Sequence, residues 1–128
     1  HVTCKPADIN QVIMNLCDNA VGAMKDARTP SPTLTIRTSF SEASNEVVIQ
    51  VEDSGPGIPE DVLPRIFDPF FTTKDIGTGT GLGLAISFRI MANHEGRLEV
   101  DTGNWGTKFT LVLPKLEEFS EPSPRGAP

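Results

Sequence analysis

The sequence predicts an α+β domain in which two amphipathic helices accompany two β hairpins. Apolar residues recur at helical spacing over residues 8–28 and again over residues 81–94. Two pairs of short, β-branched segments fill much of the remaining chain, and turn-forming residues separate the members of each pair. With 128 residues, 38% of them hydrophobic and 22% charged, the chain has the size and composition of one soluble globular domain.

The first helix is expected to follow a short edge strand at residues 1–5. Asp8 is a candidate N-cap, and Gln11 three residues later completes a capping box. Asn15 and Asn19 lie one turn apart at the edge of an apolar stripe, where two amides suit either a polar ligand or a neighbouring backbone group. The stripe has i, i+3, i+4 and i+7 spacing and consists of Ile9, Val12, Ile13, Leu16, Ala20 and Met24.

The first hairpin is predicted over residues 33–40 and 46–53. Its first strand alternates apolar and polar residues, as a half-buried strand does, with Leu34 and Ile36 on one face. The second strand ends in the sequence D-S-G-P-G-I-P, which starts at Asp53. A carboxylate followed by two glycines suits recognition of a flat polar ligand, because glycine lets a ligand approach the backbone closely. The same residue types also form ordinary turns.

A short helix is predicted at residues 60–66, and the sequence I-F-D-P-F-F-T-T-K follows it from Ile66 to Lys74. Three of the chain's seven phenylalanines, Phe67, Phe70 and Phe71, gather in this predicted loop. Aromatic side chains in a loop suit either a surface that faces a partner or a small cluster that folds inward.

A glycine-rich loop, G-T-G-T-G-L-G-L-A-I from Gly77 to Ile86, leads directly into the second predicted helix. Free backbone N–H groups and the positive end of the helix dipole suit an anion at such a junction. A mobile surface loop is the alternative interpretation. Gly96 is predicted to stop the helix, and residues 97–100 and 107–113 are predicted to form the second hairpin.

The acidic balance of the chain argues against nucleic-acid binding. The net charge is −6 and the pI is about 4.8, whereas nucleic-acid binding needs Lys and Arg to neutralise phosphates. Cys4 and Cys17 lack metal-ligand spacing, and reduced cysteines suit a cytoplasmic setting. The apolar runs are too short to span a bilayer. Because the chain begins at His1 rather than Met, we expect a piece of a longer protein.

Five motifs, in this order and at this spacing, resemble the catalytic ATP-binding domain of two-component sensor histidine kinases, the HATPase_c domain of the GHKL superfamily. The resemblance spans residues 5–114, and the short segment between Lys74 and Gly79 is similar to the nitrogen-regulation branch of these kinases. The motifs are N-L-C-D-N-A (15–20), D-S-G-P-G-I-P (53–59), I-F-D-P-F-F-T-T-K (66–74), G-T-G-L-G-L-A-I (79–86) and G-N-W-G-T-K-F (103–109).

The resemblance implies a Bergerat fold, an α/β sandwich with one mixed sheet that helices cover on one face. It places the catalytic ATP-binding domain at residues 1–116. Residues 117–128, which are rich in proline and acidic residues, are expected to form a disordered tail.

The resemblance also implies ATP and Mg²⁺ as cofactors. The Asp53 carboxylate would accept a hydrogen bond from the adenine amino group, Gly57 would line the base, and Thr107 would support it through water. Asn19 would ligate Mg²⁺, and Asn15 would contact the phosphates or the metal. Asn15 and Lys74 are the predicted catalytic residues. The other predicted cofactor-binding positions are Gly55, Ile58, Thr73, Gly79, Thr80, Gly81, Leu82, Gly83 and Leu84.

The function that the resemblance implies is transfer of the ATP γ-phosphate to a histidine. That histidine would lie on a separate dimerisation domain, because neither His1 nor His94 has the expected helical-hairpin context. The implied partners are this dimerisation domain in the full-length homodimer and a downstream response regulator. No nucleic acid and no membrane contact by this domain are implied, and the setting is cytoplasmic even where the parent protein is membrane-anchored. Phe70 is expected to dock on the dimerisation domain.

Departures from the family pattern keep two alternatives open. Gly22 stands where many members carry a basic residue, and Lys25 and Lys74 are the nearest substitutes. A catalytically silent nucleotide-binding or docking module is therefore one alternative. A stand-alone GHKL ATPase or an anti-sigma serine kinase is the other, although such hydrolytic relatives tend to carry Glu at the position of Asn15. Trp105, in the last motif, suits either packing beside the base or a structural role.

Overall fold

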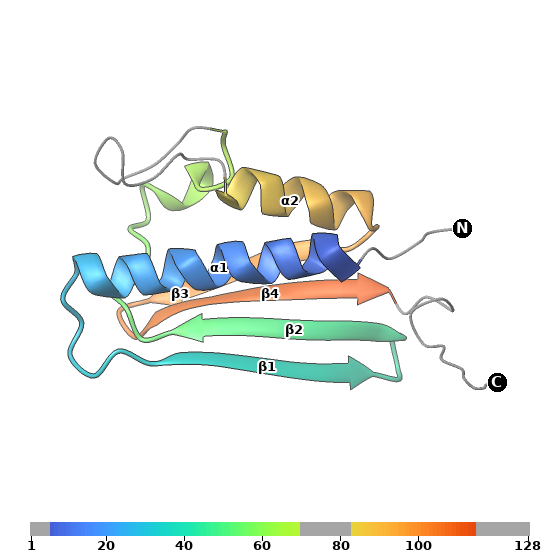
Figure 1. Cartoon of the computed structure of the whole chain (residues 1–128), viewed down its shortest axis with the longest axis horizontal. Helices are drawn as coiled ribbons and strands as arrows, with labels where there is room; N and C mark the ends of the chain where they lie inside the picture. Colours follow the sequence, from blue (N-terminus) through green and yellow to red (C-terminus); the bar gives the residue numbers. More distant parts are fainter. Residues whose placement is uncertain (1–5, 70–82, 115–128) are drawn as a thin grey trace.

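Two helices lie over one face of a four-stranded sheet in the computed structural model of the chain, which describes residues 6–69 and 83–114 (Figure 1). The predicted α+β class is confirmed. None of the described helices combines the length and the hydropathy needed to cross a membrane. The elements are α1 (Pro6–Asp26), β1 (Leu34–Ser41), β2 (Glu46–Asp53), the 3-10 helix η1 (Leu63–Arg65), α2 (Gly83–Asn93), β3 (Arg97–Gly103) and β4 (Gly106–Pro114).

The sheet has the strand order β1-β2-β4-β3, and every pair of described neighbours is antiparallel. The two predicted hairpins therefore join through their second strands, β2 and β4, which occupy the middle of the sheet. The resemblance implies a mixed sheet, which has both parallel and antiparallel pairs. The three pairs formed by these four strands are all antiparallel. The predicted edge strand at residues 1–5 lies outside the described residues.

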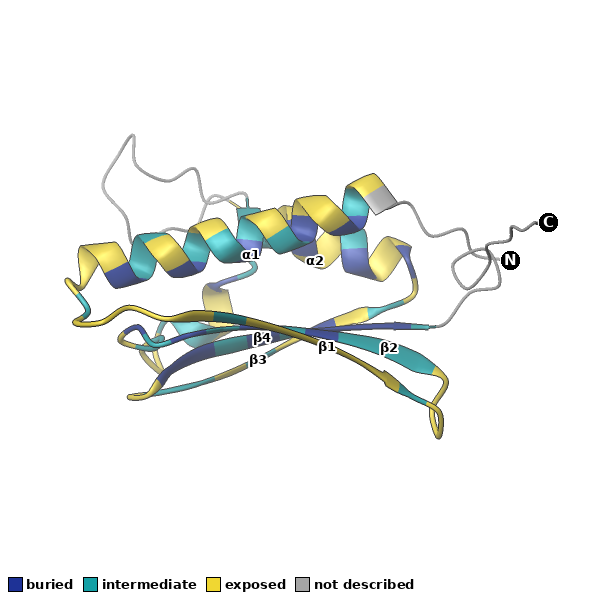
Figure 2. Ribbon diagram, turned by 60° about the horizontal axis from the view of Figure 1, so that its bottom comes forward, coloured by how far each residue is buried: buried dark blue, intermediate teal, exposed yellow. Residues whose placement is uncertain are grey.

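The core lies between the helices and the inner face of the sheet, and Figure 2 shows both helices on that one side. The predicted apolar stripe of α1 is confirmed, since five of its six members are buried and Ile13 packs against them. Leu16 and Leu111 are fully buried, one from α1 and one from β4. Burial of a leucine side chain contributes about 1.5–3 kcal/mol, so this layer supplies much of the stability that holds the site residues in place.

The ends of α1 differ from the prediction at both termini. The helix begins at Pro6, so Asp8 lies inside the first turn and its predicted role as N-cap is wrong. Proline is well suited to the start of a helix because its missing N–H has no intrahelical partner there. At the other end Arg28 adopts a left-handed φ of 53°, and the Thr29 N–H donates to the Met24 carbonyl at 2.9 Å. This Schellman arrangement ends the helix two residues before the predicted position.

A similar arrangement ends α2, and it changes the role of Gly96. The left-handed residue is Glu95, with a φ of 58°, and the Gly96 N–H donates to the Met91 carbonyl at 2.8 Å. A Cβ at position 96 would lie 2.5 Å from the Val112 carbonyl oxygen. Gly96 is therefore required for close packing against β4 rather than for the backbone conformation that stops the helix.

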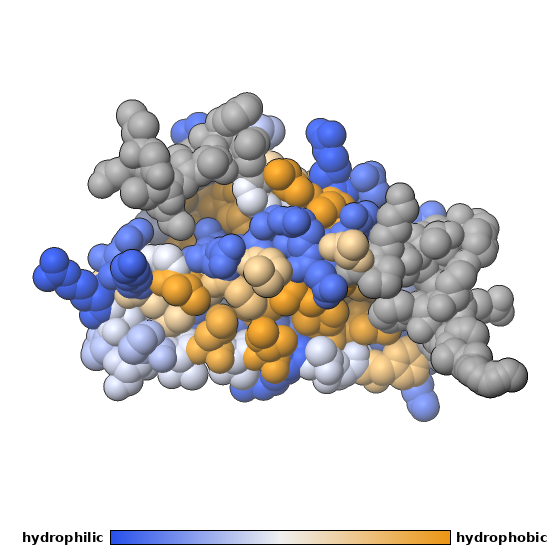
Figure 3. Space-filling view, viewed as in Figure 1, coloured by the Kyte–Doolittle hydropathy of each residue, from blue (hydrophilic) through white to orange (hydrophobic). Residues whose placement is uncertain are grey.

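The first strand is more exposed than its alternating pattern predicts. Leu34, Ile36 and Phe40 lie on the inner face, opposite Asp53, Val51 and Val47 of β2. Ile36 is nevertheless 50% exposed and Phe40 44% exposed. The reason is that β1 is the edge strand of the described sheet. Apolar side chains gather along the flank where α1 faces this strand (Figure 3).

Two shorter elements also depart from the prediction. The helix expected over residues 60–66 is a turn followed by η1, because Pro64 lacks the N–H that an α-helix would pair with the Glu60 carbonyl. Strand β3 continues to Gly103, three residues beyond its predicted end. Gly103 and Gly106 are paired across the hairpin, so only Asn104 and Trp105 form the turn.

Candidate functional site

A buried carboxylate at the end of β2 is the centre of the candidate site. Asp53 is only 7% exposed, and its Oδ1 accepts hydrogen bonds from the backbone N–H of Gly55 at 2.8 Å and of Thr107 at 3.2 Å. Among the described residues no hydrogen bond reaches Oδ2, so this oxygen remains available to accept one from a ligand. Burial raises the pKa of the Asp53 carboxyl; the two backbone N–H groups oppose this rise, and Glu52 adds to it.

Two glycines with left-handed or extended positive φ bring the neighbouring loop and hairpin against this carboxylate. Gly57 has a φ of 83°, and a Cβ there would lie 2.1 Å from the Gly103 carbonyl oxygen. Gly106 has a φ of 137°, and a Cβ there would lie 2.0 Å from the Asp53 carbonyl oxygen. Backbone therefore packs directly on backbone at both places, and any side chain would push the wall of the site away.

Replacing Gly57 with alanine should lower the free energy of unfolding by at least about 1–3 kcal/mol, because the new Cβ meets a backbone oxygen and the positive φ is strained. Chemical denaturation measures this loss. Gly83→Ala is the matched control, since its Cβ would meet only Asn15 side-chain carbons at 3.9 Å. A Gly57 variant as stable as the control would contradict the close contact.

A threonine that the motifs did not single out connects the loop after β2 to the second hairpin. The hydroxyl of Thr102 donates to the Gly106 carbonyl at 3.0 Å and accepts from the Ile58 N–H at 2.9 Å. It also lies 2.9 Å from the hydroxyl of Thr107. Because the one hydroxyl hydrogen of Thr102 is already donated, Thr107 must be the donor between them. The signal for Thr102 is its position directly opposite Thr107 in the strand register.

This assignment defines what Thr107 offers to a ligand. Thr107 is 5% exposed and its hydroxyl hydrogen is committed to Thr102, so the oxygen has only lone pairs left. A water molecule that bridges Thr107 to a base would therefore donate a hydrogen to it. The arrangement is compatible with the water-mediated role that the resemblance implies for Thr107.

Asn15 and Asn19 of α1 have different surroundings, although both are half-buried. The Nδ2 of Asn15 donates to the Gly83 carbonyl and to the Ser87 hydroxyl, both at 3.2 Å, and its Oδ1 accepts from Gln11 at 2.9 Å. The side chain of Asn19 makes no hydrogen bond within the described part of the chain. Its amide oxygen is thus free to serve as a hard ligand, and an oxygen of this kind suits Mg²⁺. The residues present therefore fit a magnesium-bound nucleotide.

Several predicted positions complete the site or lie beyond it. Gly83 and Leu84 form the first turn of α2, next to Asn15, and Ile58 packs against the edge of the core. Trp105 is 45% exposed at the hairpin tip, with its indole against Gly103. The predicted residues that fall outside the described ranges are Thr73, Lys74, Gly79, Thr80, Gly81 and Leu82.

Of the three phenylalanines in the motif at residues 66–74, the structure describes Phe67. The ring of Phe67 packs on the ring of Phe88 in α2, with 5.0 Å between the centroids. This contact supports an inward-facing cluster for Phe67, and it joins the segment after η1 to the second helix. Phe70 and Phe71 lie outside the described residues.

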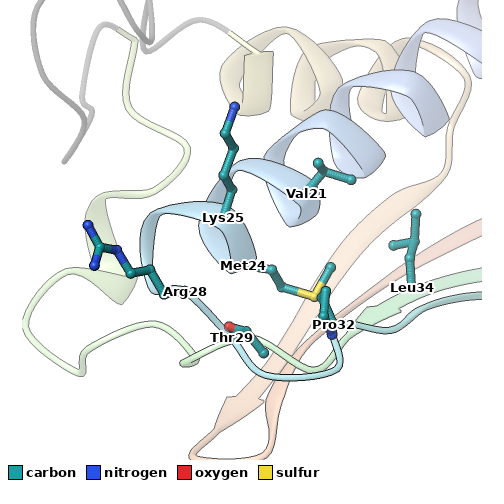
Figure 4. Close-up of a pocket in the computed structure, with 7 residues that line it drawn as sticks. All are labelled: Val21, Met24, Lys25, Arg28, Thr29, Pro32 and Leu34. Carbon is teal, nitrogen blue, oxygen red and sulfur yellow. The ribbon is translucent and has the colours of Figure 1, made fainter.

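A separate hollow of about 420 Å³ lies at the end of α1, on the side that faces β1 (Figure 4). Met24 lines the hollow and also packs against the loop after Asp53, where the Ser54 hydroxyl lies 3.6 Å from the Met24 sulfur. Lys25, a candidate substitute for the basic residue that is absent at Gly22, lines it, whereas the predicted cofactor-binding residues within the described ranges do not. The lining residues are Val21, Met24, Lys25, Arg28, Thr29, Pro32 and Leu34.

The fold and the five motifs together define a class of protein, the ATP-binding domains built as an α/β sandwich. The model of one family, described as the histidine kinase-, DNA gyrase B- and HSP90-like ATPases, matches residues 4–117. The chain belongs to this family.

Curated relatives of the chain include a sporulation kinase and a sensory histidine kinase. Sporulation kinase A of Bacillus subtilis (strain 168) is 44% identical over 108 residues, which cover 84% of this chain and 16% of that protein. The sensory histidine kinase/phosphatase NtrB of Rhizobium leguminosarum bv. phaseoli is 37% identical over 120 residues, which cover 86% of this chain and 31% of that protein. The chain thus spans less than a third of the length of either relative.

Solved structures give the same result. The nucleotide-free catalytic domain of histidine kinase ThkA superposes with a TM-score of 0.74 at 35% identity, covering 89% of this chain and 70% of that one. Full-length ShkA, solved in complex with AMPPNP, has a TM-score of 0.74 at 28% identity, covering 88% of this chain and 22% of that one. The predicted resemblance to histidine kinase catalytic domains, with NtrB among the relatives, is therefore confirmed.

Proposed function

We propose that this domain binds ATP with Mg²⁺ and transfers the γ-phosphate to a histidine on a separate dimerisation domain of its parent protein. A response regulator would then receive the phosphate, and the cytoplasm is the setting in which we expect this to occur. The observation that carries the proposal is the Oδ2 of buried Asp53, which accepts no hydrogen bond from the described residues and lies among the glycines of a histidine kinase catalytic fold.

Adenine recognition follows from the chemistry of this oxygen. An ionised carboxylate only accepts hydrogen bonds, so Asp53 pairs with an amino group and repels a carbonyl. Adenine carries an amino group at C6, whereas hypoxanthine carries a carbonyl at the same position. The site therefore favours ADP over inosine diphosphate, a nucleotide that differs mainly at this group.

Other residues of the site would bind the phosphates and the metal ion. Asn19 would hold Mg²⁺, Asn15 would contact the phosphates or the metal, and Lys74 would reach the γ-phosphate. Bound Mg²⁺ supplies neutralisation of charge on the phosphates. The residues of this chain position the nucleotide for an in-line transfer and form no covalent bond with it. His94 is only 5% exposed, which supports an acceptor histidine outside this domain.

Isothermal titration of the domain with ADP and Mg²⁺ tests the binding step. A second experiment tests transfer: the domain is mixed with a separately made dimerisation domain and labelled ATP, and label on histidine is measured. Nucleotide binding without transfer would instead support a catalytically silent docking module. This is the alternative that Gly22, in place of a basic residue, suggests. Hydrolysis of ATP by the domain alone would support a stand-alone ATPase.

We also propose that the phenylalanine motif docks on the dimerisation domain. Phe70→Ala should then reduce autophosphorylation several-fold more than it reduces nucleotide binding, because it removes an aromatic contact to the partner domain. Phe67→Ala is the comparison variant, since its ring is engaged with Phe88 within this domain. Equal losses of transfer and of binding in Phe70→Ala would refute docking.

A further inference from the structure

A small polar network joins α1 to the first turn of α2. The Nδ2 of Asn15 donates to the Gly83 carbonyl and to the Ser87 hydroxyl, both at 3.2 Å. The Ser87 hydroxyl in turn donates to the Gly83 carbonyl at 2.9 Å. Ser87 has no exposed surface at all, whereas Gln11, which donates to the Oδ1 of Asn15 at 2.9 Å, is exposed.

The network settles which way the Asn15 carboxamide points. The single hydroxyl hydrogen of Ser87 goes to Gly83, so its oxygen can only accept from Asn15. The amino side of Asn15 must therefore face α2, and the donation from Gln11 to its oxygen agrees with this orientation. The amino group donates to the two acceptors on α2, and the oxygen accepts from Gln11 alone among the described residues, which leaves it a lone pair. Asn15 thus offers its amide oxygen to a ligand as an acceptor.

An ordinary structural role accounts for only part of this arrangement. A serine inside a helix often bonds back to the carbonyl four residues earlier, as Ser87 does with Gly83. That bond satisfies Ser87 without any help from Asn15. The reverse does not hold, because the Asn15 amino group would lose one of its two acceptors on α2 if Ser87 were removed. The Gly83 carbonyl would then be the one described acceptor left on the amino side, and the carboxamide would be held less firmly in its present orientation.

We propose that Ser87 is a positioning residue that holds the Asn15 carboxamide with its oxygen toward the cation of the bound nucleotide. The inference rests on the proposed function. It adds Ser87, which lies outside the five motifs and for which the sequence predicts no role. Through Ser87 and Gly83, the orientation of Asn15 depends on the N-terminal part of α2. The metal side of the site is therefore coupled to the helix that follows the glycine-rich loop.

A double-mutant cycle tests the proposal in the whole chain. ADP affinity is measured with Mg²⁺ and with EDTA for the wild type, Ser87→Ala, Asn15→Ala and the double variant. Loss of one hydrogen bond predicts that Ser87→Ala reduces the Mg²⁺-dependent gain in affinity about 3- to 10-fold. No further reduction is expected when Asn15 is already alanine, and the affinity in EDTA should stay unchanged. The same loss in both backgrounds, or an equal loss with and without Mg²⁺, overturns the proposal.

Gln11→Ala provides a second variant that leaves the core intact, because Gln11 is exposed. It removes the other anchor of the same carboxamide, so it should reduce the Mg²⁺-dependent gain in the same direction, again only when Asn15 is present. Asn10→Ala, an exposed amide on the same helix outside the network, is the matched control. The Asn15 side-chain amide resonances of the nucleotide-free protein should shift in Ser87→Ala and not in Asn10→Ala.

The outcomes separate this inference from the proposed function. A wild-type chain that binds no nucleotide overturns both. A wild-type chain that binds ADP with Mg²⁺, together with a Ser87→Ala variant whose Mg²⁺-dependent gain is unchanged, overturns the positioning role alone. If Ser87→Ala fails to fold in thermal melts, Gln11→Ala and its cycle with Asn15→Ala decide the matter.

Discussion

Replacing Asp53 with asparagine is expected to weaken ADP binding by at least about 1.5 kcal/mol, a factor of about ten or more. Asparagine preserves the shape and can keep Oδ1 as acceptor for the Gly55 and Thr107 N–H groups. It replaces the free Oδ2 with an amino group, which cannot accept a hydrogen bond from adenine. Isothermal titration with ADP and Mg²⁺ measures the loss.

Inosine diphosphate supplies the matched comparison for this prediction. The wild type should bind ADP more tightly than inosine diphosphate, because Oδ2 of Asp53 meets an amino group in one and a carbonyl in the other. In Asp53→Asn the preference should shrink or reverse, since the new amide can donate to the carbonyl. An unchanged ratio of the two affinities would show that Asp53 does not contact this edge of the base.

The same substitution should leave the unliganded domain at least as stable at neutral pH. Burial raises the pKa of Asp53, so the folded state binds its proton more tightly than the unfolded state does. The stability that this group contributes is therefore present at low pH and is lost as the pH rises through the raised pKa. Asparagine does not titrate. Relative to the wild type, the Asp53→Asn variant should gain stability as the pH rises from the ordinary aspartate range, and thermal melts over pH measure this difference.

The second large effect is expected at Asn19. Asn19→Ala should reduce the apparent affinity for Mg²⁺ in the presence of ADP at least about tenfold, because even groups that only hydrogen-bond to a metal ligand contribute about 10- to 100-fold. The half-buried amide of Asn19 makes no hydrogen bond with other described residues, so its removal breaks no described network. Titration of Mg²⁺ into the ADP-bound domain measures the change.

Two further variants sharpen this test. Asn19→Asp retains an oxygen ligand and should keep the response to Mg²⁺. Asn10→Ala makes the same chemical change on the exposed side of α1 and should have no effect on it. A Mg²⁺ titration of Asn19→Ala that matches the wild type would remove Asn19 from the metal site.

Local patterns were sufficient to predict most of the fold. The helical spacing of α1 and the alternation in β2 reflect which side chains face the core, and this is a property of the sequence that packing preserves. The errors fall at helix ends and at the edge strand. Pro6 rather than Asp8 begins α1, and Ile36 stays exposed because nothing in a strand's own pattern says whether it lies at the edge of a sheet.

Some residues of the candidate site can likewise be predicted from local motifs, whereas others depend on the tertiary structure. Asp53, Gly57 and Thr107 were predicted from motifs that are far apart in the chain, and the structure brings the Asp53 carboxylate within 3.2 Å of the Thr107 N–H. Thr102 was missed because its partner is fixed by the register of β3 and β4. The roles of these residues toward a nucleotide remain predictions that the variants above test.

By itself the sequence determined the class of fold, the family, and the residue types that a nucleotide site needs. Only the tertiary structure decided which of their atoms are still free. Asn15 and Asn19 are both asparagines and lie one helical turn apart, and no local sequence pattern distinguishes them. Asn15 meets Gly83 and Ser87, which lie 68 and 72 positions further along the chain, and its amino group donates to them. The difference arises because hydrogen-bonding capacity is used up by neighbours in space, and those neighbours are set by how α2 packs on α1.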